Sequence, residues 1–455
     1  MRMTRFPASA AAWLLAIAVL AGCRRGASDG VALVGGTLID GSGGPALPDA
    51  AIVVRGGRIE SVGTRAGFQL PPRTVEVELR GRWIVPGFID AHAHVEPWAL
   101  PRYLAWGVTT VRDLHGGLEG ILRLRDRVNR GEVAGPRMYG AGAMIDGLPT
   151  SFPDALGAST PRDARKAVDR LVNSGVDLVK VYTRVDPTLL RALLDEAKTF
   201  NLRVSGHLGM TNAVVAAEAG ISSIEHLTGV PEASLGDASS LVAAHYRGFF
   251  PGWTAFERSW ATLDSASLDR VATRLAEQRV KLVPTLVLHE TFSRLDDPAL
   301  LQDTMLRAVP NLPQQRWNVP DMVRRAGWTA QDFTAFRAAR PHQDLFLRRF
   351  AAAGGIIAAG TDASNQLLIP GYSEHREMEL LVNAGLTPGD ALAAATRNGA
   401  LLLGVDSLGL IAPGKAADLV VLTRDPLADI RNTLAIDRVM SRGVLLSADS
   451  LRRAW

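Results

Sequence analysis

Two histidines one residue apart, His92 and His94, follow the run Trp-Ile-Val-Pro-Gly-Phe-Ile-Asp at residues 83–90. On an extended strand, side chains at positions i and i+2 point to the same face, so both imidazoles can bind one cation. Two partly buried histidines with ordinary hydrogen bonds would give the same pattern. A metal site therefore requires further ligands elsewhere in the chain.

Further candidate ligands lie within or directly after other short apolar runs. They are Lys180 in Leu-Val-Lys-Val-Tyr, His207 after Ser-Gly, His226 after Ile-Glu, and Asp362 after Gly-Thr. Each of these residues alone has an ordinary interpretation as a capping or hydrogen-bonded polar group. Their occurrence together at the ends of apolar runs favours one shared site.

Elements of two kinds must position these residues. Short apolar runs alternate with helical patterns, which is typical of βα units and a parallel sheet. Eight candidate strands cover residues 84–89, 109–112, 137–139, 178–182, 203–206, 223–225, 281–286 and 356–359. The sequence therefore predicts an α/β protein with a (β/α)8 barrel over residues 84–407, whose active site lies at the carboxyl ends of the strands.

The two flanks of the barrel have a different pattern. Residues 31–83 and 408–447 contain short apolar runs separated by glycine-rich turns, which are hairpin signals. We expect the two flanks to form one small composite β-sandwich. The length of 455 residues suits a barrel of about 250 residues or more with such a module, and 47% apolar residues are typical of a globular protein.

The first 22 residues are predicted to be a lipoprotein signal peptide. Arg2 and Arg5 precede an apolar stretch at 8–19 that is too short for a permanent membrane span. Leu-Ala-Gly-Cys at 20–23 resembles a bacterial lipobox, so Cys23 is the predicted lipidation site and residues 23–30 a tether. The alternative is a buried structural thiol. As the only cysteine, Cys23 cannot form an internal disulfide.

The net charge and the predicted signal peptide restrict the kinds of binding partner that the sequence supports. The net charge is +4, and removal of Arg2 and Arg5 with the signal leaves about +2, which gives no support for nucleic-acid binding. A lipid anchor at Cys23 predicts a bacterial cell-envelope protein that faces the periplasm. Arg24 follows Cys23 in place of an aspartate associated with inner-membrane retention, which favours the outer membrane.

The ordered motifs resemble those of the amidohydrolase superfamily, in its binuclear, carboxylated-lysine, prolidase- or imidazolonepropionase-like branch. The matching segments are Pro-Gly-Phe-Ile-Asp-Ala-His92-Ala-His94, Val-Lys180-Val-Tyr, Ser-Gly-His207, Ile-Glu-His226 and Gly-Thr-Asp362. The match covers nearly the whole chain after the signal. The resemblance implies a metal-dependent hydrolase with a (β/α)8 barrel and a flanking β-sandwich.

The resemblance also implies the roles of the ligands. His92, His94 and Asp362 would bind one divalent metal, and His207 and His226 a second. Lys180, carboxylated by CO2, would bridge the two. Its amine must be neutral to react, and burial beside cations lowers a lysine pKa. Zinc suits this ligand set, although manganese and cobalt do as well.

The implied reaction is cleavage of a C–N amide bond in a small molecule such as a dipeptide, an N-acyl amino acid or a cyclic amide. A hydroxide between the metals would attack the carbonyl, with Asp362 as general base. Tyr182 and His115 are candidate substrate-binding residues. A packed barrel tyrosine and a solvated loop histidine are the alternatives for these two.

Three other functions fit the same residues. A lactonase or phosphotriesterase would use the same hydroxide, and a mononuclear deaminase or imidazolonepropionase-like hydrolase would not need the Lys180 bridge. The third is a non-catalytic binding lipoprotein. Substrate and oligomeric state stay open at this stage.

The segment at 289–350 is long for a βα connection and indicates a helical lid. Its aromatic residues Trp317, Trp328, Phe333 and Phe336 either shape a substrate pocket or dock the segment onto the barrel.

Overall fold

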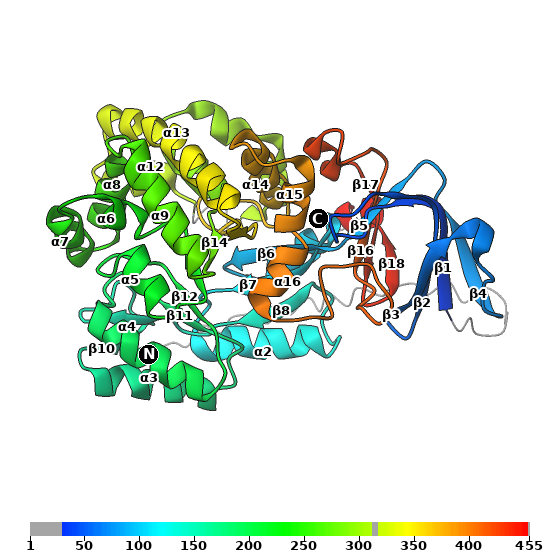
Figure 1. The fold of residues 1–455 in the computed structure, drawn as a ribbon, viewed down its shortest axis with the longest axis horizontal. Coiled ribbons are helices and arrows are strands. Elements are labelled where there is room, and N and C mark those ends of the chain that lie inside the picture. The colour runs from blue at the N-terminus through cyan, green and yellow to red at the C-terminus, as the bar shows by residue number, and fades with distance from the viewer. Residues whose placement is uncertain (1–29, 312–316, 454–455) are drawn as a thin grey trace, which may run out of the picture.

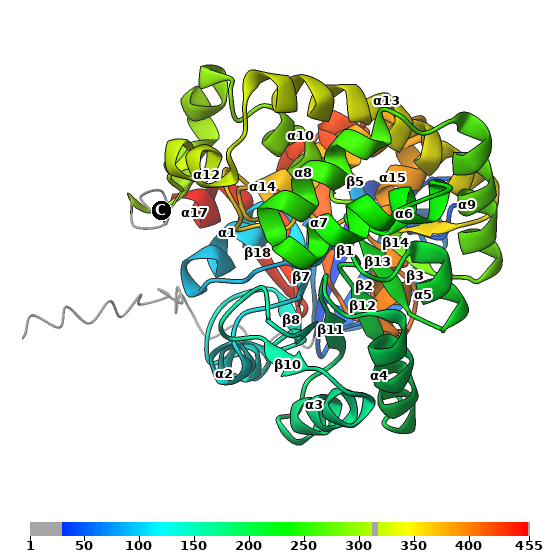
Figure 2. The same cartoon turned by 90° about the vertical axis from the view of Figure 1, so that its left-hand side faces the viewer.

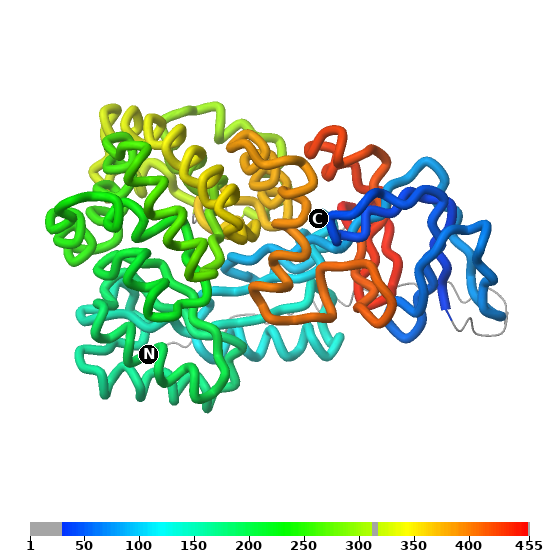
Figure 3. The backbone as a smooth tube through the Cα atoms, viewed as in Figure 1, coloured from blue at the N-terminus to red at the C-terminus, as the bar shows by residue number. Residues whose placement is uncertain are grey.

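Strands from both ends of the chain form one mixed sheet in the computed structural model, which describes residues 30–311 and 317–453. The chain order of its strands is β1 (Gly30–Leu38), β2 (Leu47–Arg55), β3 (Arg58–Thr64), β4 (Thr74–Glu78), β5 (Trp83–Pro86), β16 (Leu419–Leu422), β17 (Ile436–Ser441) and β18 (Val444–Ser447). Strand β16 joins the halves, because it pairs antiparallel with both β5 and β17. Figure 3 shows the blue N-terminal and red C-terminal segments side by side.

The barrel lies beside this sheet (Figure 1). Its parallel strands are β6 (Phe88–Ala93), β7 (Val108–Asp113), β8 (Arg137–Gly140), β11 (Val179–Val181), β12 (Val204–Gly206), β13 (Ser223–Glu225), β14 (Lys281–Val283) and β15 (Ile356–Ile357). After β8, the short strand β9 (Ile145–Gly147) pairs with β11 and with β10 (Leu156–Ala158). A parallel bridge between Ala93 in β6 and Ala363, beyond the end of β15, joins the first strand to the chain that follows the last strand. The predicted α/β barrel with a composite β-sandwich is confirmed.

Helices cover the outside of the barrel. They include α2 (Leu118–Asn129), α3 (Pro161–Asn173), α4 (Pro187–Thr199), α5 (Ala213–Glu218), α9 (Ser265–Glu277), α14 (Tyr372–Asn383), α15 (Pro388–Ala394) and α16 (Arg397–Leu403). Helix α3 shows why they form where they do. Thr160 and Asp163 make a reciprocal capping box around Pro161, which satisfies amide groups at the helix start. Val168 and Leu171 on its apolar face are fully buried.

Two helical excursions cover the carboxyl ends of the strands, where α8 lies across the end of the barrel in Figure 2. The first contains α6 (Val230–Ser234), α7 (Ser239–Arg247) and α8 (Phe249–Trp260), and the second contains α10 (Leu286–Ser293), α12 (Val319–Ala326) and α13 (Ala330–Ala352). The predicted lid segment at 289–350 is helical over much of its length. Trp328, Phe333 and Phe336 are buried against one another, and Trp328 also packs against Phe250 of α8 and Phe292 of α10.

The strand predicted at 84–89 is two strands in different sheets. The chain leaves the sandwich at Pro86 and enters the barrel at Phe88. A side chain at Gly87 would lie 2.1 Å from the Thr109 hydroxyl, so only glycine permits this close crossing. The sandwich therefore extends to Pro86, three residues beyond the predicted boundary.

The predicted signal peptide, Cys23 and nearly all of the tether lie outside the described residues. Within the part of the chain that the structure does describe, no helix is both long and apolar enough to cross a bilayer.

Candidate active site

All six predicted metal ligands line one cavity at the carboxyl ends of the barrel strands. The cavity measures about 600 Å³ and is also lined by Tyr182 and His115. The ligands are His92 and His94 at and after the end of β6, Lys180 in β11, His207 after β12, His226 after β13 and Asp362 beyond β15. Residues up to 270 positions apart in the sequence thus converge because parallel barrel strands end at the same rim.

Asp362 lies between two of the histidines, His92 and His94. Its Oδ1 is 3.0 Å from His92 Nε2 and 2.9 Å from His94 Nε2, and Asn365 donates to its Oδ2 at 2.6 Å. His226 lies close to the same group, with its ring centroid 4.4 Å from that of His92. Potential ligand atoms of His92, His226 and Asp362 all lie within 4.8 Å of one another, so His226, expected to bind the second metal, lies beside two residues expected to bind the first.

The remaining ligands continue the cluster. The ring of His207 is 4.8 Å from the ring of His226 and 4.7 Å from that of Tyr182.

His226 and Asp362 both have positive φ values, 58° and 62°. Non-glycine residues adopt this conformation infrequently. The chain turns sharply here at the strand ends, which directs both side chains into the cavity.

The second ring nitrogens of three histidines are held by the protein. His92 Nδ1 donates to Glu225 Oε2 at 2.8 Å, His94 Nδ1 donates to the His115 carbonyl at 3.0 Å, and His226 Nδ1 is paired with the Thr285 hydroxyl at 2.7 Å. Such contacts fix the ring orientation and leave Nε2 for the cavity side. This is the arrangement that metal-ligating histidines generally have.

Glu225 is itself the centre of a buried network. Its Oε1 accepts from Arg112 at 2.9 Å, Ser205 at 2.6 Å and Ser223 at 2.8 Å. Burial raises the pKa of Glu225, but the charges of Arg112 and His92 outweigh this effect, and the net pKa is lowered. Glu225 is therefore ionised and holds His92 from inside the barrel.

Lys180 has the surroundings that carboxylation requires. Its side chain is 2% exposed, and within the described part of the chain its Nζ lacks a hydrogen-bond partner. Val179 and Val181 on either side are fully buried in the core. Burial lowers the pKa of Lys180 to about 8, so a substantial fraction of its amine is neutral near pH 7 to 8 (about one tenth to one half). A buried amine without a hydrogen-bond partner, in the same cavity as the four candidate histidines, fits a group that is modified before it binds metal.

The protonation states of His207, His226 and Asp362 also fit metal ligation, whereas His94 keeps a proton in the metal-free protein that a bound metal would displace. Burial lowers the pKa values of His207 and His226 well below the usual value, so both imidazoles are neutral. Burial raises the pKa of Asp362, yet its histidine neighbours outweigh that effect and keep the carboxylate ionised. Burial also lowers the pKa of His94, but the hydrogen bond and charge of Asp362 raise it to about 9.

Tyr182 and His115 both face the cavity. Tyr182 is 6% exposed, and burial raises its pKa well above the usual value, so the phenol keeps its proton. His115 is not a free loop histidine, because its Nε2 lies 3.2 Å from Asp154 Oδ1 and its carbonyl accepts from His94. Both residues can donate or accept hydrogen bonds at the cavity wall.

Sequence reasoning missed two features of the site. Glu225 stands directly before His226 in the Ile-Glu-His motif, and an acidic residue in a short apolar strand is the signal that marks it. The second feature is the aromatic wall supplied by Phe249, Phe250 and Trp253 of α8. That wall belongs to the connection before β14, whereas the sequence predicts a lid only in the connection after β14, at residues 289–350.

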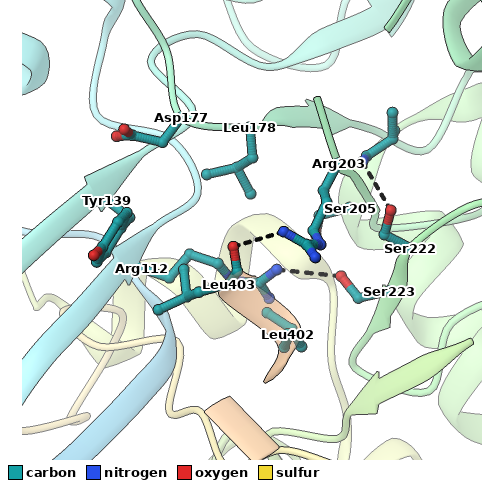
Figure 4. A pocket seen from close by; sticks show the side chains of 11 residues that line it. Arg112, Tyr139, Asp177, Leu178, Arg203, Ser205, Ser222, Ser223, Leu402 and Leu403 are labelled. Carbon is teal, nitrogen blue, oxygen red and sulfur yellow. Dashed lines mark hydrogen bonds between the residues drawn. The ribbon is translucent and has the colours of Figure 1, made fainter. Parts of the chain in front are cut away.

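A second, smaller cavity lies at the opposite end of the strands (Figure 4). Asp177, Arg203 and Ser222 at its wall lie just before β11, β12 and β13. Arg203 Nη1 donates to the Leu403 carbonyl at 2.8 Å, and Arg112 Nη1 donates to Ser223 at 3.2 Å. With about 20 Å³ of space, it has room for about one water molecule, and barrel active sites lie at the other end.

A closed parallel barrel whose strand ends bring together four histidines, a buried lysine and an aspartate defines a metal-dependent hydrolase. The comparisons give the family. Residues 83–446 match the model of the amidohydrolase family, and the chain belongs to it. Members of this family typically use metal ions, which agrees with the ligand cluster described above.

Individual relatives are consistent with this assignment. The imidazolonepropionase of Cereibacter sphaeroides is 27% identical over 406 residues, which is 87% of this chain and 93% of the relative. A bottromycin amidohydrolase structure is 25% identical, with a TM-score of 0.72 over 94% of this chain and 89% of its own. A Xaa-Pro dipeptidase structure shares the fold, with 21% identity, a TM-score of 0.66, and coverage of 92% and 100%. The protein is a hydrolase that acts on C–N bonds.

Proposed function

We propose that this protein is a binuclear zinc amidohydrolase, exported and lipid-anchored, that cleaves the amide bond of a dipeptide or an N-acyl amino acid. The observation that carries the binuclear assignment is the buried, unpartnered Nζ of Lys180 among the histidines. A mononuclear site would leave this amine without a function and with an unfavourable burial. Carboxylation turns it into an anionic ligand.

The residues fit two ions. His92, His94 and Asp362 would hold one, His207 and His226 the other, and carboxylated Lys180 would contact both. The nitrogen and oxygen donors of this set suit zinc. When bound, the metals would supply Lewis-acid activation of water and of the scissile carbonyl.

The chain itself supplies proton transfer and orientation. The ionised carboxylate of Asp362 can accept a proton from the attacking water and deliver it to the leaving amine nitrogen. The neutral phenol of Tyr182, beside His207, can donate a hydrogen bond to the carbonyl oxygen. Apolar side chains of α8, α10 and α12 line the cavity and would displace water from around a bound substrate.

The test is metal content by elemental analysis of the purified mature chain and of its Lys180→Ala variant. We expect about two metals per wild-type chain, and about one or fewer in the variant, since a bridging ligand serves both ions. Lys281→Ala is the matched control, because Lys281 also lies in a barrel strand, β14, but does not line the cavity. One metal in both wild type and Lys180→Ala would refute the binuclear assignment.

Activity assays on the metal-loaded protein then test the reaction. Dipeptides, N-acyl amino acids, lactones and phosphotriesters form the panel. Turnover of amides above esters supports the proposal, whereas exclusive turnover of lactones or phosphotriesters would contradict it. Deamination without amide cleavage would identify a deaminase.

Export and anchoring are proposed from the sequence before residue 30, where a signal-like apolar stretch precedes Cys23. Wild type should partition with membranes, and Cys23→Ser should move to the soluble fraction with its metal content unchanged. Equal partitioning of the two forms would contradict the lipid anchor.

A further inference from the structure

The outer part of the active-site cavity has an aromatic wall. Phe152 comes from the loop after β9, Phe249, Phe250 and Trp253 from α8, and Phe292 from α10. Ring centroids of Phe249 and Phe250 lie 5.3 Å apart, and those of Trp253 and Phe292 lie 5.5 Å apart. Such a wall favours a substrate that carries an aromatic ring or a long apolar chain.

One cationic side chain, that of Arg325 on α12, stands on this wall. Its guanidinium carbon is 5.9 Å from the centroid of Phe250, and its Nε lies 2.9 Å from Asp321 Oδ2. The side chain is 61% exposed. A guanidinium has five N–H donors, so the contact with Asp321 leaves donors free for a ligand.

The cavity has little negative charge to compete with a ligand at Arg325. Among the described residues that line it, Asp362 is the only carboxylate. Asp362 is already engaged by His92, His94 and Asn365. An anionic group that enters the cavity would therefore meet Arg325 with only the carboxylate of Asp321 beside it, and Asp321 does not line the cavity.

We infer that the substrate is an amide with a carboxylate at one end, which Arg325 binds, and with an aromatic or long apolar group, which the α8 and α10 side chains contact. This inference rests on the proposed amide hydrolysis and makes it more specific. A planar guanidinium can bind a carboxylate with two parallel hydrogen bonds. Arg325 is thus a specificity-determining residue, whereas bond cleavage is left to the ligands and Asp362.

The test compares two probes with the metal-loaded protein. One is an N-phenylacetyl amino acid, and the other is its amino-alcohol analogue, in which a hydroxymethyl group replaces the carboxylate without adding a second scissile bond. We expect wild type to favour the acid in kcat/KM by about fivefold, which corresponds to about 1 kcal/mol. Arg325→Gln should lose this preference through a higher KM for the acid, with kcat nearly unchanged.

Arg324→Gln is the matched control. Arg324 is the preceding residue on α12, shares the ion-pair partner Asp321 and is 77% exposed, but it does not line the cavity. The control should keep the preference of wild type. An equal preference in Arg325→Gln and wild type, or none in wild type, would overturn the inference.

Calorimetric binding of the acid separates this inference from the proposed function. If neither probe is cleaved, amide hydrolysis of this class fails. Binding of the acid to wild type and Arg324→Gln, but more weakly to Arg325→Gln, would still support the carboxylate site. Equal binding to all three forms would refute it.

A second variant tests the aromatic wall. Phe250→Ala should reduce the advantage of an N-phenylacetyl over an N-acetyl substrate while keeping the preference for the acid over the alcohol. Loss of the acid preference in Phe250→Ala, with the acyl preference unchanged, would contradict the separate roles given to the wall and to Arg325.

Discussion

Glu225→Gln tests whether the network inside the barrel tunes the metal site. The variant keeps the shape of the side chain but removes the charge that His92 Nδ1 contacts at 2.8 Å and Arg112 Nη2 at 2.9 Å. Loss of such an outer contact typically lowers metal affinity by about 10- to 100-fold. At about 1.4 kcal/mol for each factor of ten, this is about 1.4 to 2.8 kcal/mol of binding free energy.

Folding stability should fall as well. Arg112 is 2% exposed, and breaking a buried ion pair by removing one partner costs about 3–5 kcal/mol. The glutamine oxygen can still accept from Ser205 or Ser223, so we expect the lower end of this range. Urea unfolding of the chelator-treated protein measures this effect independently of metal binding.

The assay for affinity is competition for zinc with a chromophoric chelator. Glu232→Gln is the control, because Glu232 is 4% exposed and lies 2.7 Å from His245 Nε2, yet neither residue is among the proposed ligands. It should lose stability but keep its zinc affinity. A zinc affinity of Glu225→Gln equal to that of wild type would refute the role given to this network.

Three further predictions follow from the same site. In chelator-treated protein, the pKa of His94 is raised to about 9, against about 6.5 in the unfolded chain. Protonated His94 therefore stabilises the fold fully below a pH of about 6.5, and this contribution is lost as the pH rises through 9. Thermal unfolding of the metal-free protein should occur at a lower temperature at pH of about 9 than at pH of about 7, unlike that of the metal-loaded form. Gly360→Ala should destabilise the protein by about 1–3 kcal/mol and reduce metal content in elemental analysis, because the new methyl group would lie 2.7 Å from the His92 backbone nitrogen. Trp253→Ala should lower the urea-unfolding free energy by about 3–5 kcal/mol, since its 3% exposed ring stacks on His289; a change below about 1 kcal/mol would contradict this packing role.

Much of the barrel could be predicted because its strands are short, apolar and separated by amphipathic helices. Even the third strand, predicted at 137–139, corresponds to β8 at Arg137–Gly140. The error at 84–89 has a simple cause. The run is apolar throughout, and periodicity gives no sign that the chain changes sheets at Gly87. That change depends on the close approach of Thr109, which is a tertiary contact.

The candidate ligands could be found because each is a polar residue beside a strand whose other residues are apolar. The contacts around them could not be found in this way. Thr285, for example, reaches His226 from the connection after β14, and its partner is specified only by the packing of neighbouring strands. The aromatic wall is similar, because α8 belongs to a helical pattern that does not reveal which face covers the cavity.

The Ala93–Ala363 bridge, which joins the first barrel strand to the chain after the last one, has a consequence for the order of assembly. During synthesis, His92 and His94 emerge about 270 residues before Asp362, a separation of about 13 to 54 seconds at about 5–20 residues per second. Until then, the first strand has an unpaired edge and its histidines lack their carboxylate partner. A nascent or truncated chain that ends before residue 362 therefore lacks one of the six proposed ligands. On the proposed ligand assignment, full metal loading is a late event that follows the last barrel strand.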